Sequence, residues 1–571
     1  MHRFPKALLL GMAFSQLLTI AAPAADSGAR KEIGDVLVQY TPATYYIWTD
    51  KIWYQQGQDT EVVLRWTANA NQDPYPYTTL VYLQNIETGE RQYVSNGSLG
   101  DEVRDTAGNG AGQFLPQPLL ASEGMQLVST PTPELGHWQF VAELRDVTAT
   151  RVVKRAYAKF VVVDGTVDLG FNGNDVEISE DTTWTSDKVY RIRYQVFVNS
   201  GATLTIEPGT VVAAQGQNAV LVIERGGQIM AEGRRELPIV MTCEANVGQR
   251  FSGCWAGLIV LGSAPVNLEG EDAIAEGVLP ATRPVYGGDD PEESSGVLKY
   301  VRVEFAGVDF TNEIQPNAFG FHGVGSGTVI DHIQAHEGED DGIEFFGGTA
   351  NMKYFVSDGA KDDSLDWALG WTGNAQFGFV LQDSVEGDNG IEADNNENGF
   401  NNEPRSNPKI WNLTMIGDPS AGHGVHLRRG TAATLRNCVI VGFGEFGFRI
   451  ENDETFQQAT QGNLNLDDCL FWNSAGAQDL AGQIHPDALS YVDGRTGVIS
   501  EAPMMRSTQF AGNPDPRALD AAPLGLIGNA ASPPSNGFFD TSASYLGAFG
   551  EENWLEEWTN FGAEEDLAAG Q

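Results

Sequence analysis

Alternating apolar and polar residues mark the first part of the chain. The stretches TEVVLRWTA (60–68), YTTLVYLQN (77–85), HWQFVAELRD (137–146) and AYAKFVVVDG (156–165) follow this alternation, and Gly, Asn, Asp and Pro clusters separate them. A period of two predicts strands that bury one face. Several such strands in succession predict a β-sandwich of immunoglobulin-like type over residues 26–165, with a role in spacing or docking.

From about residue 184 the pattern changes. The stretches VFVNSGATLTIEPGTVV (196–212), LVIERGGQIMAEG (221–233) and PIVMTC (238–243) are short β-branched runs that Gly and Pro interrupt. Ile206 and Ile229 are 23 residues apart. A repeat of this length without helical periodicity predicts a parallel β-helix, in which each coil buries its apolar face only by stacking on its neighbours.

Three motifs make the sequence similar to a known class of proteins: GATLTIEPGTVV (201–212), A-x-G-x4-P-I-V-x-T (231–242) and W-x-G-L-I-V-L-G (255–262). They resemble the secreted right-handed parallel β-helix proteins of bacterial surfaces, which have the pectin-lyase-like fold. The resemblance implies an all-β chain and says little about activity. We therefore expect the right-handed parallel β-helix over residues 166–545 and a C-terminal cap or tail over 546–571.

A small residue followed by an apolar one recurs at residues 320, 342, 364, 390, 424 and 447. If these steps are in register on successive coils, the apolar residue of each step points into the coil, as does the residue two positions later. The residue between them then points outward. We call the resulting row the outward column, and it is predicted to contain His322, Glu344, Asp366, Glu392, His426 and Arg449.

The outward column is crowded with carboxylates, because Asp340, Asp341, Asp362, Asp363 and Asp388 directly precede its strands. Side chains on neighbouring coils lie about 4.8 Å apart, so these acids would repel one another and raise each other's pKa values. A bound divalent cation would remove this conflict, and Ca²⁺ takes six to eight oxygen ligands. The alternative is a solvated acidic face without an ion.

A further candidate calcium ligand is Asp394, the first residue of DNNENG (394–399). This stretch matches the first half of the D-x-[DN]-x-[DN]-G calcium loop. The twelfth position holds Arg405 instead of Glu, although Glu403 could replace it. An Asn-rich turn without an ion is the alternative interpretation.

The acidic coils also resemble the family 9 pectate lyases, which are calcium-dependent polysaccharide lyases with this fold. Asp341 of DGI, and the three aspartates of DDSLD (362–366), match the residues that hold Ca²⁺ in that family. The base of the family is a lysine after an Asn-Gly-apolar step, where this sequence has Glu392. Register, resemblance and the partial calcium loop together predict these metal ligands: Asp341, Glu344, Asp362, Asp363, Asp366, Glu392 and Asp394.

β-Elimination needs a neutral base that removes the proton alpha to a uronate carboxylate. Because the lysine is missing, we expect His426 or Arg428 as the base and Arg449 as a clamp on the substrate. Glu392 could be the base only with a raised pKa and without a bound metal. His426 could also be a simple cap of the acids. Carboxylates on adjacent coils have the spacing of retaining glycosidases as well, but a β-helix produces that spacing automatically.

The net charge and the N-terminal targeting signal limit the possible binding partners and the location of the protein. The chain has 34 basic and 77 acidic residues, a net charge of −43, which disfavours binding to nucleic acid or an anionic membrane and favours divalent cations. Arg3 and Lys6, an apolar run and the stretch APAA (22–25) predict a secretory signal peptide over residues 1–25. No later stretch is apolar enough to span a bilayer. We expect a protein that is secreted, extracellular or at the cell surface, or else periplasmic.

The chain has four cysteines, and an even number of cysteines in an exported chain predicts disulfides. Cys243 and Cys254 would close one loop, and Cys438 and Cys469 would join neighbouring coils. Free buried thiols are the alternative.

The predicted function is that of an exported calcium-binding β-helix protein that binds or cleaves an extracellular, acidic polysaccharide. The alternative is a non-catalytic structural or adhesion protein of the cell surface or matrix, in which the cation stiffens a rod. A lyase requires a neutral nitrogen beside the ion, whereas a purely structural site would seal the ion with protein oxygens.

Overall fold

The computed structural model describes residues 45–562 apart from twelve gaps. These are 69–77, 96–97, 101–114, 117–124, 146–151, 269–272, 279–282, 309–314, 383–385, 504, 506–513 and 519–529. The predicted signal peptide lies outside the described residues. No helix in the described ranges is both long and apolar enough to cross a membrane.

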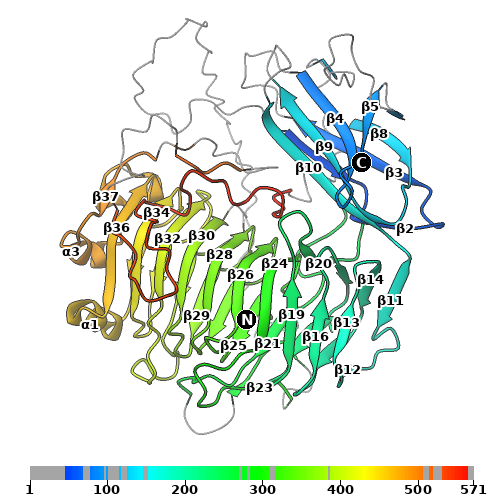
Figure 1. Cartoon of the computed structure of the whole chain (residues 1–571). Helices are drawn as coiled ribbons and strands as arrows, with labels where there is room; N and C mark the ends of the chain where they lie inside the picture. The colour runs from blue at the N-terminus through cyan, green and yellow to red at the C-terminus, as the bar shows by residue number, and fades with distance from the viewer. Residues whose placement is uncertain are drawn as a thin grey trace, which may run out of the picture. The chain divides into compact units, whose positions relative to one another are not determined.

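Residues 45–163 form two β-sheets whose neighbouring strands are antiparallel, except that β2 runs parallel to β10 (Figure 1). One sheet contains β1 (Tyr45–Thr49), β3 (Glu61–Ala68) and β8 (Met125–Pro131). The other contains β2 (Trp53–Gln55), β10 (Val152–Val163), β9 (Gly136–Arg145), β4 (Thr78–Asn85), β5 (Arg91–Ser95) and β6 (Ser98–Gly100), with β7 (Leu115–Pro116) beside β4. Leu64, Val81 and Phe140 belong to their shared buried core. The alternation therefore predicted the strands correctly, while the immunoglobulin-like type stays a prediction.

The described parts of residues 165–500 wind through two long parallel sheets, which is the architecture of a parallel β-helix. The larger sheet contains β11 (Gly165–Leu169), β13 (Thr182–Trp184), β14 (Lys188–Ile192), β16 (Thr203–Ile206), β17 (Val211–Ala214), β19 (Gln228–Glu232), β20 (Ile239–Cys243), β24 (Gly296–Glu304), β26 (Val329–His336), β28 (Asn351–Asp358), β30 (Asn374–Gln382), β32 (Lys409–Gly417), β34 (Ala433–Val441), β36 (Leu464–Trp472) and β37 (Ile499–Ser500).

The smaller parallel sheet carries the outward column. It contains β12 (Val176–Ile178), β15 (Gln195–Val198), β18 (Val220–Ile223), β21 (Gly257–Leu261), β25 (Phe319–His322), β27 (Ile343–Phe346), β29 (Leu365–Ala368), β31 (Ile391–Ala393), β33 (Val425–Leu427) and β35 (Phe448–Ile450). A short hairpin, β22 (Ala273–Ile274) and β23 (Val285–Tyr286), lies in an insertion after β21. The predicted interior row of Ile343, Leu365, Ile391 and Val425 is fully buried in one continuous core.

One residue per coil in the longer strands of the larger sheet has a left-handed backbone. Tyr300, His332, Tyr354 and Phe377 take this conformation, with φ between 49° and 63°. Their rings stack from coil to coil with centroid distances of 4.2, 4.4 and 4.8 Å. A left-handed residue with a side chain costs roughly 1–2 kcal/mol, and stacking in register offsets part of that cost.

The segment expected as a cap or tail, 546–571, is described as far as residue 562. It packs along the outer face of the larger sheet, where Val356, Phe379 and Leu381 present an apolar surface. Trp554 and Trp558 meet the aromatic stack edge-on. The segment therefore covers the side of the coils rather than their end.

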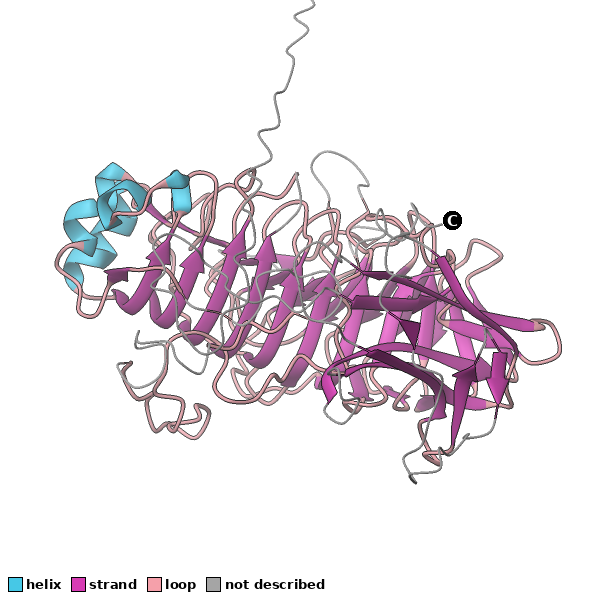
Figure 2. Ribbon diagram, turned by 90° about the horizontal axis from the view of Figure 1, so that it is seen from above, coloured by secondary structure: helices cyan, strands magenta, loops and turns pink. Residues whose placement is uncertain are grey.

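The end of the coil stack is covered by helical segments instead (Figure 2). They are α1 (Asp453–Gln461), α2 (Leu480–Gln483) and α3 (Leu489–Val492), with 3-10 turns at Ser474–Gly476 and Pro486–Ala488. Ile484, Ala488 and Val492 join the core of the coils. They shield the last strands from pairing with another chain.

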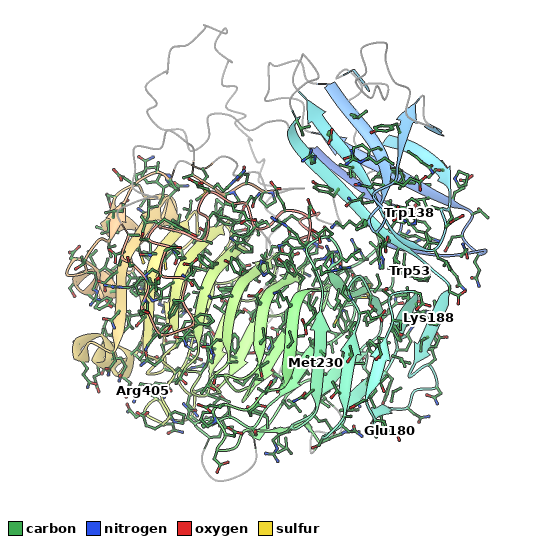
Figure 3. The ribbon with its side chains drawn as sticks, viewed as in Figure 1. Trp53, Trp138, Glu180, Lys188, Met230 and Arg405 are labelled. Atoms are coloured by element: carbon green, nitrogen blue, oxygen red, sulfur yellow. A yellow bond between two sulfur atoms is a disulfide. The ribbon has the colours of Figure 1, made fainter. Side chains whose placement is uncertain are left out.

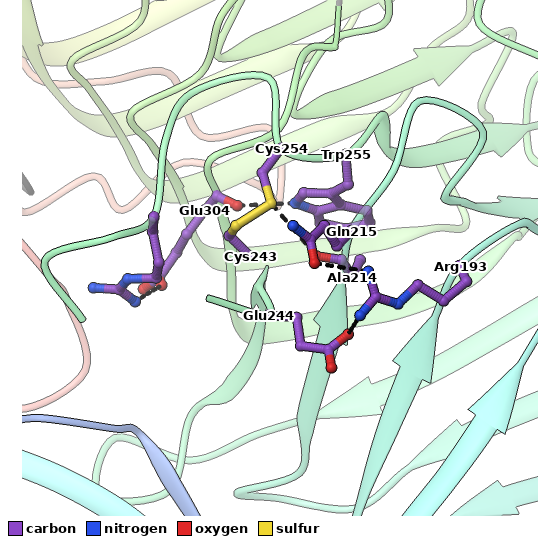
Figure 4. The surroundings of a disulfide bond; sticks show 9 residues. Arg193, Ala214, Gln215, Cys243, Glu244, Cys254, Trp255 and Glu304 are labelled. Carbon is purple, nitrogen blue, oxygen red and sulfur yellow. Dashed lines mark hydrogen bonds and ion pairs between the residues drawn. A yellow bond between two sulfur atoms is a disulfide. The ribbon is translucent and has the colours of Figure 1, made fainter. Parts of the chain in front are cut away.

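One of the two predicted disulfides is present. Cys243 and Cys254 are bonded, with Cα atoms 5.7 Å apart (Figure 4). The second prediction is wrong, because Cys438 and Cys469 are in register on β34 and β36 with both thiols free. In-register neighbours hold their Cβ atoms about one strand spacing apart, which exceeds the roughly 3.8 Å that a disulfide requires.

A buried charge network lies at the ends of three strands of the larger sheet. His336 Nδ1 lies 2.6 Å from Asp358 Oδ2, and Glu304, in register with His336, pairs with Arg250 and Arg302. Burial alone would lower the pKa of His336. Asp358 outweighs this effect, and with Glu337 and Glu304 it raises the pKa of His336 to about 9.

This raised pKa predicts a pH-dependent contribution to stability. Histidine in the unfolded chain titrates near about 6.5, so the stabilisation by protonated His336 is complete below that pH and is lost as the pH rises to about 9. The melting temperature of His336→Gln should lie several degrees below wild type at about pH 6, and the gap should close by about pH 9.5. A gap that does not vary with pH in thermal unfolding would contradict this account. His485→Gln is the matched control at a more exposed site.

Candidate metal centre

The outward column lies on five successive strands of the smaller sheet. Glu344 on β27, Asp366 on β29 and Glu392 on β31 are in register, and His426 on β33 and Arg449 on β35 continue the row. Their neighbours on either side along each strand are fully or almost fully buried in the coil. The column residues themselves point outward, because side chains alternate along a strand.

The predicted first member of the column, His322, is misplaced. β25 pairs with β27 so that Gly320 is in register with Glu344, and His322 with Phe346. The His322 ring stacks on Phe346 at 4.2 Å and packs edge-on against Tyr286, and burial lowers the pKa of His322 to about 3. The Gly-Phe step of this coil lies two residues later than the other steps, so an alignment on glycine fails here.

A ladder of hydrogen bonds holds the residues that precede the strands. Asp341 Oδ1 accepts the backbone N–H of Asp363 at 2.9 Å, and Asp363 Oδ1 accepts that of Asn389 at 2.6 Å. Asn389 Oδ1 in turn accepts the backbone N–H of His423 at 2.9 Å, and His423 Nδ1 accepts that of Phe446 at 3.3 Å. Each side chain satisfies the backbone of the next coil, and this ties the aspartates down despite their mutual repulsion.

Eight carboxylates gather in four overlapping groups of three, and in each group one oxygen per residue lies within 4.8 Å of the others. The groups are Asp340–Asp341–Asp362, Asp341–Glu344–Asp366, Asp362–Asp363–Asp388 and Asp363–Asp366–Glu392. The third and fourth groups repeat the first and second one coil further along. Six of the seven predicted metal ligands are brought together in this way, and Asp394 is the one left out.

Burial and repulsion both disfavour the ionised form of these acids. The pKa values of Asp341, Glu344 and Asp363 are raised well above the usual range, first by burial and then by neighbouring carboxylates. Burial is also the main cause that raises the pKa of Asp340 and of Asp366 to about 8. A fully ionised cluster therefore requires a counter-charge.

Two buried oxygens at this cluster have no hydrogen-bond partner, namely Asp366 Oδ1 and Asn317 Oδ1. The other end of the Asn317 amide is engaged, because its Nδ2 donates to Glu344 Oε2 at 2.5 Å. Carboxylate and amide oxygens are the ligands that Ca²⁺ prefers. The donor set therefore fits a hard divalent cation held by oxygen.

Arginines neutralise the acids at the Glu392 end of the outward column. Arg428 pairs with both Glu392 and Asp394, and Arg429 donates to Asp394 at 2.6 Å. Both oxygens of Asp394 are thus engaged by guanidinium groups. This arrangement places Asp394 in an ion-pair network and counts against its predicted role as a calcium ligand.

The remainder of the predicted calcium loop makes structural contacts. The Asn395 amide donates to two backbone carbonyls of its own loop, and Asn396 Nδ2 donates to Asn267 Oδ1 at 3.0 Å. Arg405, labelled in Figure 3, holds the predicted twelfth position and donates to the carbonyl of Gly430 at 2.5 Å. These contacts favour the alternative interpretation of an Asn-rich turn.

The predicted catalytic groups lie together beyond Glu392. His426 Nε2 lies 3.1 Å from Glu451 Oε2, and its Nδ1 faces Glu392 at 3.9 Å. Arg449 donates to the same Glu451 oxygen at 2.7 Å. Burial, and then the charge of Arg449, lower the pKa of His426, so its imidazole is neutral near pH 7. Arg428, by contrast, is an ion-pair partner of two acids.

Sequence reasoning missed two residues of the centre. Asn317 precedes β25, and Glu276 lies in the insertion after β21, from which Ala273, Ala275 and Val278 pack on the smaller sheet. The charge of Glu276 acts on both Asp340 and Glu344, and burial raises its own pKa to about 7. Glu276 does not occupy a repeating position, so the periodicity carried no signal for it. Asn317 occupies the repeat position of Asp341 one coil earlier, but the displaced glycine that misplaced His322 hid this correspondence.

Fold and centre define a parallel β-helix protein with a carboxylate-rich outer face. A family model for the pectate-lyase-like β-helix domain matches residues 176–496, and the chain belongs to this family. The matched range contains all four carboxylate groups, as well as His426, Arg428 and Arg449. The family suggests a function related to polysaccharide. No curated protein and no solved structure matches the chain.

The crowding of charge predicts an unusual effect of Asp363→Asn. In the presence of a chelator this variant should melt a few degrees above wild type, because it removes an acid whose ionised form the fold disfavours and keeps the acceptor for the N–H of Asn389. Its rise in melting temperature on adding calcium should be smaller than that of wild type. Thermal unfolding with and without calcium measures both effects. Asp289→Asn, at an exposed site, should change neither, and a destabilised Asp363→Asn in chelator would contradict the account.

Proposed function

We propose that the protein binds Ca²⁺ at the four carboxylate groups and, through this ion, an acidic polysaccharide outside the cell. The observation that carries the proposal is the repetition of three-carboxylate groups on successive coils, with buried oxygens that lack partners. The predicted signal peptide supports an extracellular location. The antiparallel domain of residues 45–163, proposed to be immunoglobulin-like, would attach the β-helix to a surface.

Different residues are proposed to bind the ion and to contact the polysaccharide. Asp341, Asp362, Asp363 and Asp366 supply the oxygens that would hold Ca²⁺. The bound ion supplies the positive charge that an array of acids lacks when it meets a uronate carboxylate. Arg449, beyond the acids on β35, is suited to contact the next negatively charged sugar along the chain.

A second candidate function, cleavage by β-elimination, is favoured by the geometry of His426. Its Nε2 is positioned to donate to Glu451, which leaves Nδ1 as a neutral acceptor directed at the column. Such a nitrogen is able to take the proton alpha to a uronate carboxylate. Arg428 is less suited to be the base, because Glu392 and Asp394 hold its guanidinium group. His426 is therefore the proposed base and Arg449 the proposed clamp.

Two assays test these proposals separately. Retention on immobilised polygalacturonate or alginate should require calcium, and the variant Asp362→Asn/Asp363→Asn/Asp366→Asn should lose retention by about tenfold or more. Formation of unsaturated product, followed by ultraviolet absorbance, should fall by about a hundredfold in His426→Gln. His485→Gln should leave product formation unchanged.

The outcomes separate the alternatives. Calcium-dependent retention without product would leave binding as the function and exclude β-elimination. Stabilisation by calcium without retention on either uronate polymer would contradict the polysaccharide proposal and favour a structural or adhesive role. Retention that does not depend on calcium would contradict the proposed bridging by the ion.

A further inference from the structure

We propose that the column holds a second divalent cation, centred on Glu344 and separate from the ion at the aspartates of DDSLD (362–366). Asp341, Glu344 and Asp366 would supply its carboxylate ligands, and Asn317 a neutral amide oxygen. The proposal rests on the proposed function, because it assumes that the acids bind a hard cation. It adds the number of ions, their separation and a neutral amide ligand, Asn317, at the repeat position of Asp341 one coil earlier.

The spacing of the coils is the first argument. Oxygen ligands lie about 2.4 Å from Ca²⁺, so two ligands on opposite sides of one ion are at most about 4.8 Å apart. That distance matches a single coil step. The column acids Glu344, Asp366 and Glu392 lie on three successive coils and span two steps, or roughly 9.6 Å. One ion therefore cannot serve both ends of the row.

The distribution of counter-charge is the second argument. At the Glu392 end, Arg428 and Arg429 already neutralise the acids. At the Glu344 end, no Lys, Arg or His within the described residues forms an ion pair with Asp340, Asp341 or Glu344. The nearby Glu276 adds further negative charge there. The unneutralised end is thus the one that needs a cation from solution.

The unpartnered amide of Asn317 is the third and independent argument. The side chain is 2% exposed, and its Nδ2 donates to Glu344 Oε2 at 2.5 Å. This contact fixes the amide with Nδ2 toward the acid, since an oxygen there would be repelled. Oδ1 is then left buried without a donor, at a cost of about 1–3 kcal/mol. A cation bound beside Glu344 would relieve this cost, and the same cation would engage the unpartnered Oδ1 of Asp366 on the next coil.

The chemistry of this set selects a hard cation. All the ligands are oxygens, from three carboxylates and one amide, which suits Ca²⁺ and also Mn²⁺ as a spectroscopic probe. The two ions would share Asp341 and Asp366, and would lie about one coil step, roughly 5 Å, apart. Paramagnetic ions at that separation are magnetically coupled, which provides a signal that does not depend on enzymatic activity.

The experiment counts ions on the intact chain. Protein stripped with chelator is dialysed against Mn²⁺ in about 0.2 M KCl, which screens loose binding to the surface charge. Bound Mn²⁺ is measured by atomic emission and by electron paramagnetic resonance. We expect about two ions per chain, with an uncoupled spectrum at one equivalent and a coupled spectrum at saturation. Glu344→Gln and Asn317→Leu should each weaken the second ion by about tenfold or more and abolish the coupling.

Two controls keep the outcomes distinct. Glu339→Gln changes a neighbouring acid that pairs with Lys361, and it should still bind both ions. Circular dichroism verifies that the variants are folded, and Glu344→Gln keeps an oxygen that can accept from Asn317. Saturation at one ion would overturn the second site and leave the proposed function intact. No bound ion would overturn both, and two ions unaffected by Glu344→Gln would overturn the assignment to Glu344.

Discussion

Exact repetition in space, one coil above another, is the constraint on which the β-helix depends. Equivalent residues on successive coils lie about 4.8 Å apart, whether they are apolar or charged. In the interior this spacing lets Ile343, Leu365, Ile391 and Val425 form a continuous core. On the outside the same spacing places Glu344, Asp366 and Glu392 directly beside one another on successive strands, where their like charges repel. The in-register stacking that stabilises the interior therefore also causes electrostatic repulsion on the outer face.

The protein reduces the repulsion between these carboxylates in different ways along the row. Before the strands, Asp341 and Asp363 each accept a backbone N–H from the next coil, which favours their charged form. Beyond Glu392, Arg428 and Arg429 provide counter-charge. Around Glu344 neither backbone hydrogen bonds nor arginines neutralise the carboxylates fully, and the unpartnered oxygens of Asn317 and Asp366 lie there. The proposed cations would complete the neutralisation where the protein supplies none.

This division has a functional consequence. An acidic surface repels an acidic polymer unless cations lie between them. The proposed ions would thus serve the fold and the ligand together, since the charge that relieves the carboxylates also attracts a uronate. His426 lies beside this region with a neutral imidazole, so the proposed binding and the proposed proton abstraction would use one row of positions.

Much of the fold followed from the sequence because the repeat is local and periodic. The inward row and the register of Glu344, Asp366, Glu392, His426 and Arg449 were predicted from small–apolar steps alone. His322 was misplaced because the glycine of its coil occupies a different position in the strand.

Other features of the fold and of the centre depend on contacts that periodicity does not encode. Glu276 reaches the centre from an irregular insertion, whereas Asn317 has the repeat position of Asp341 and was hidden by the displaced glycine of its coil. The pairing of Asp394 with Arg429 counts against its predicted role as a calcium ligand. The C-terminal segment follows the exposed apolar side of the larger sheet, whose need for cover is visible only once the coils are stacked. Cys438 and Cys469 are neighbours, as predicted, but in-register geometry keeps them apart.

The central claim, that cations neutralise the stacked carboxylates, is tested most directly by diffraction from crystals grown with Mn²⁺ in place of Ca²⁺. Anomalous difference density should lie at one or both of the groups that contain Asp366, namely Asp341–Glu344–Asp366 and Asp363–Asp366–Glu392, within about 2.5 Å of their oxygens. The account also predicts that the unpartnered Oδ1 of Asp366 will be among the ligands. A well-ordered acidic cluster without anomalous density at saturating Mn²⁺, its carboxylates joined only by shared protons or water, would contradict it.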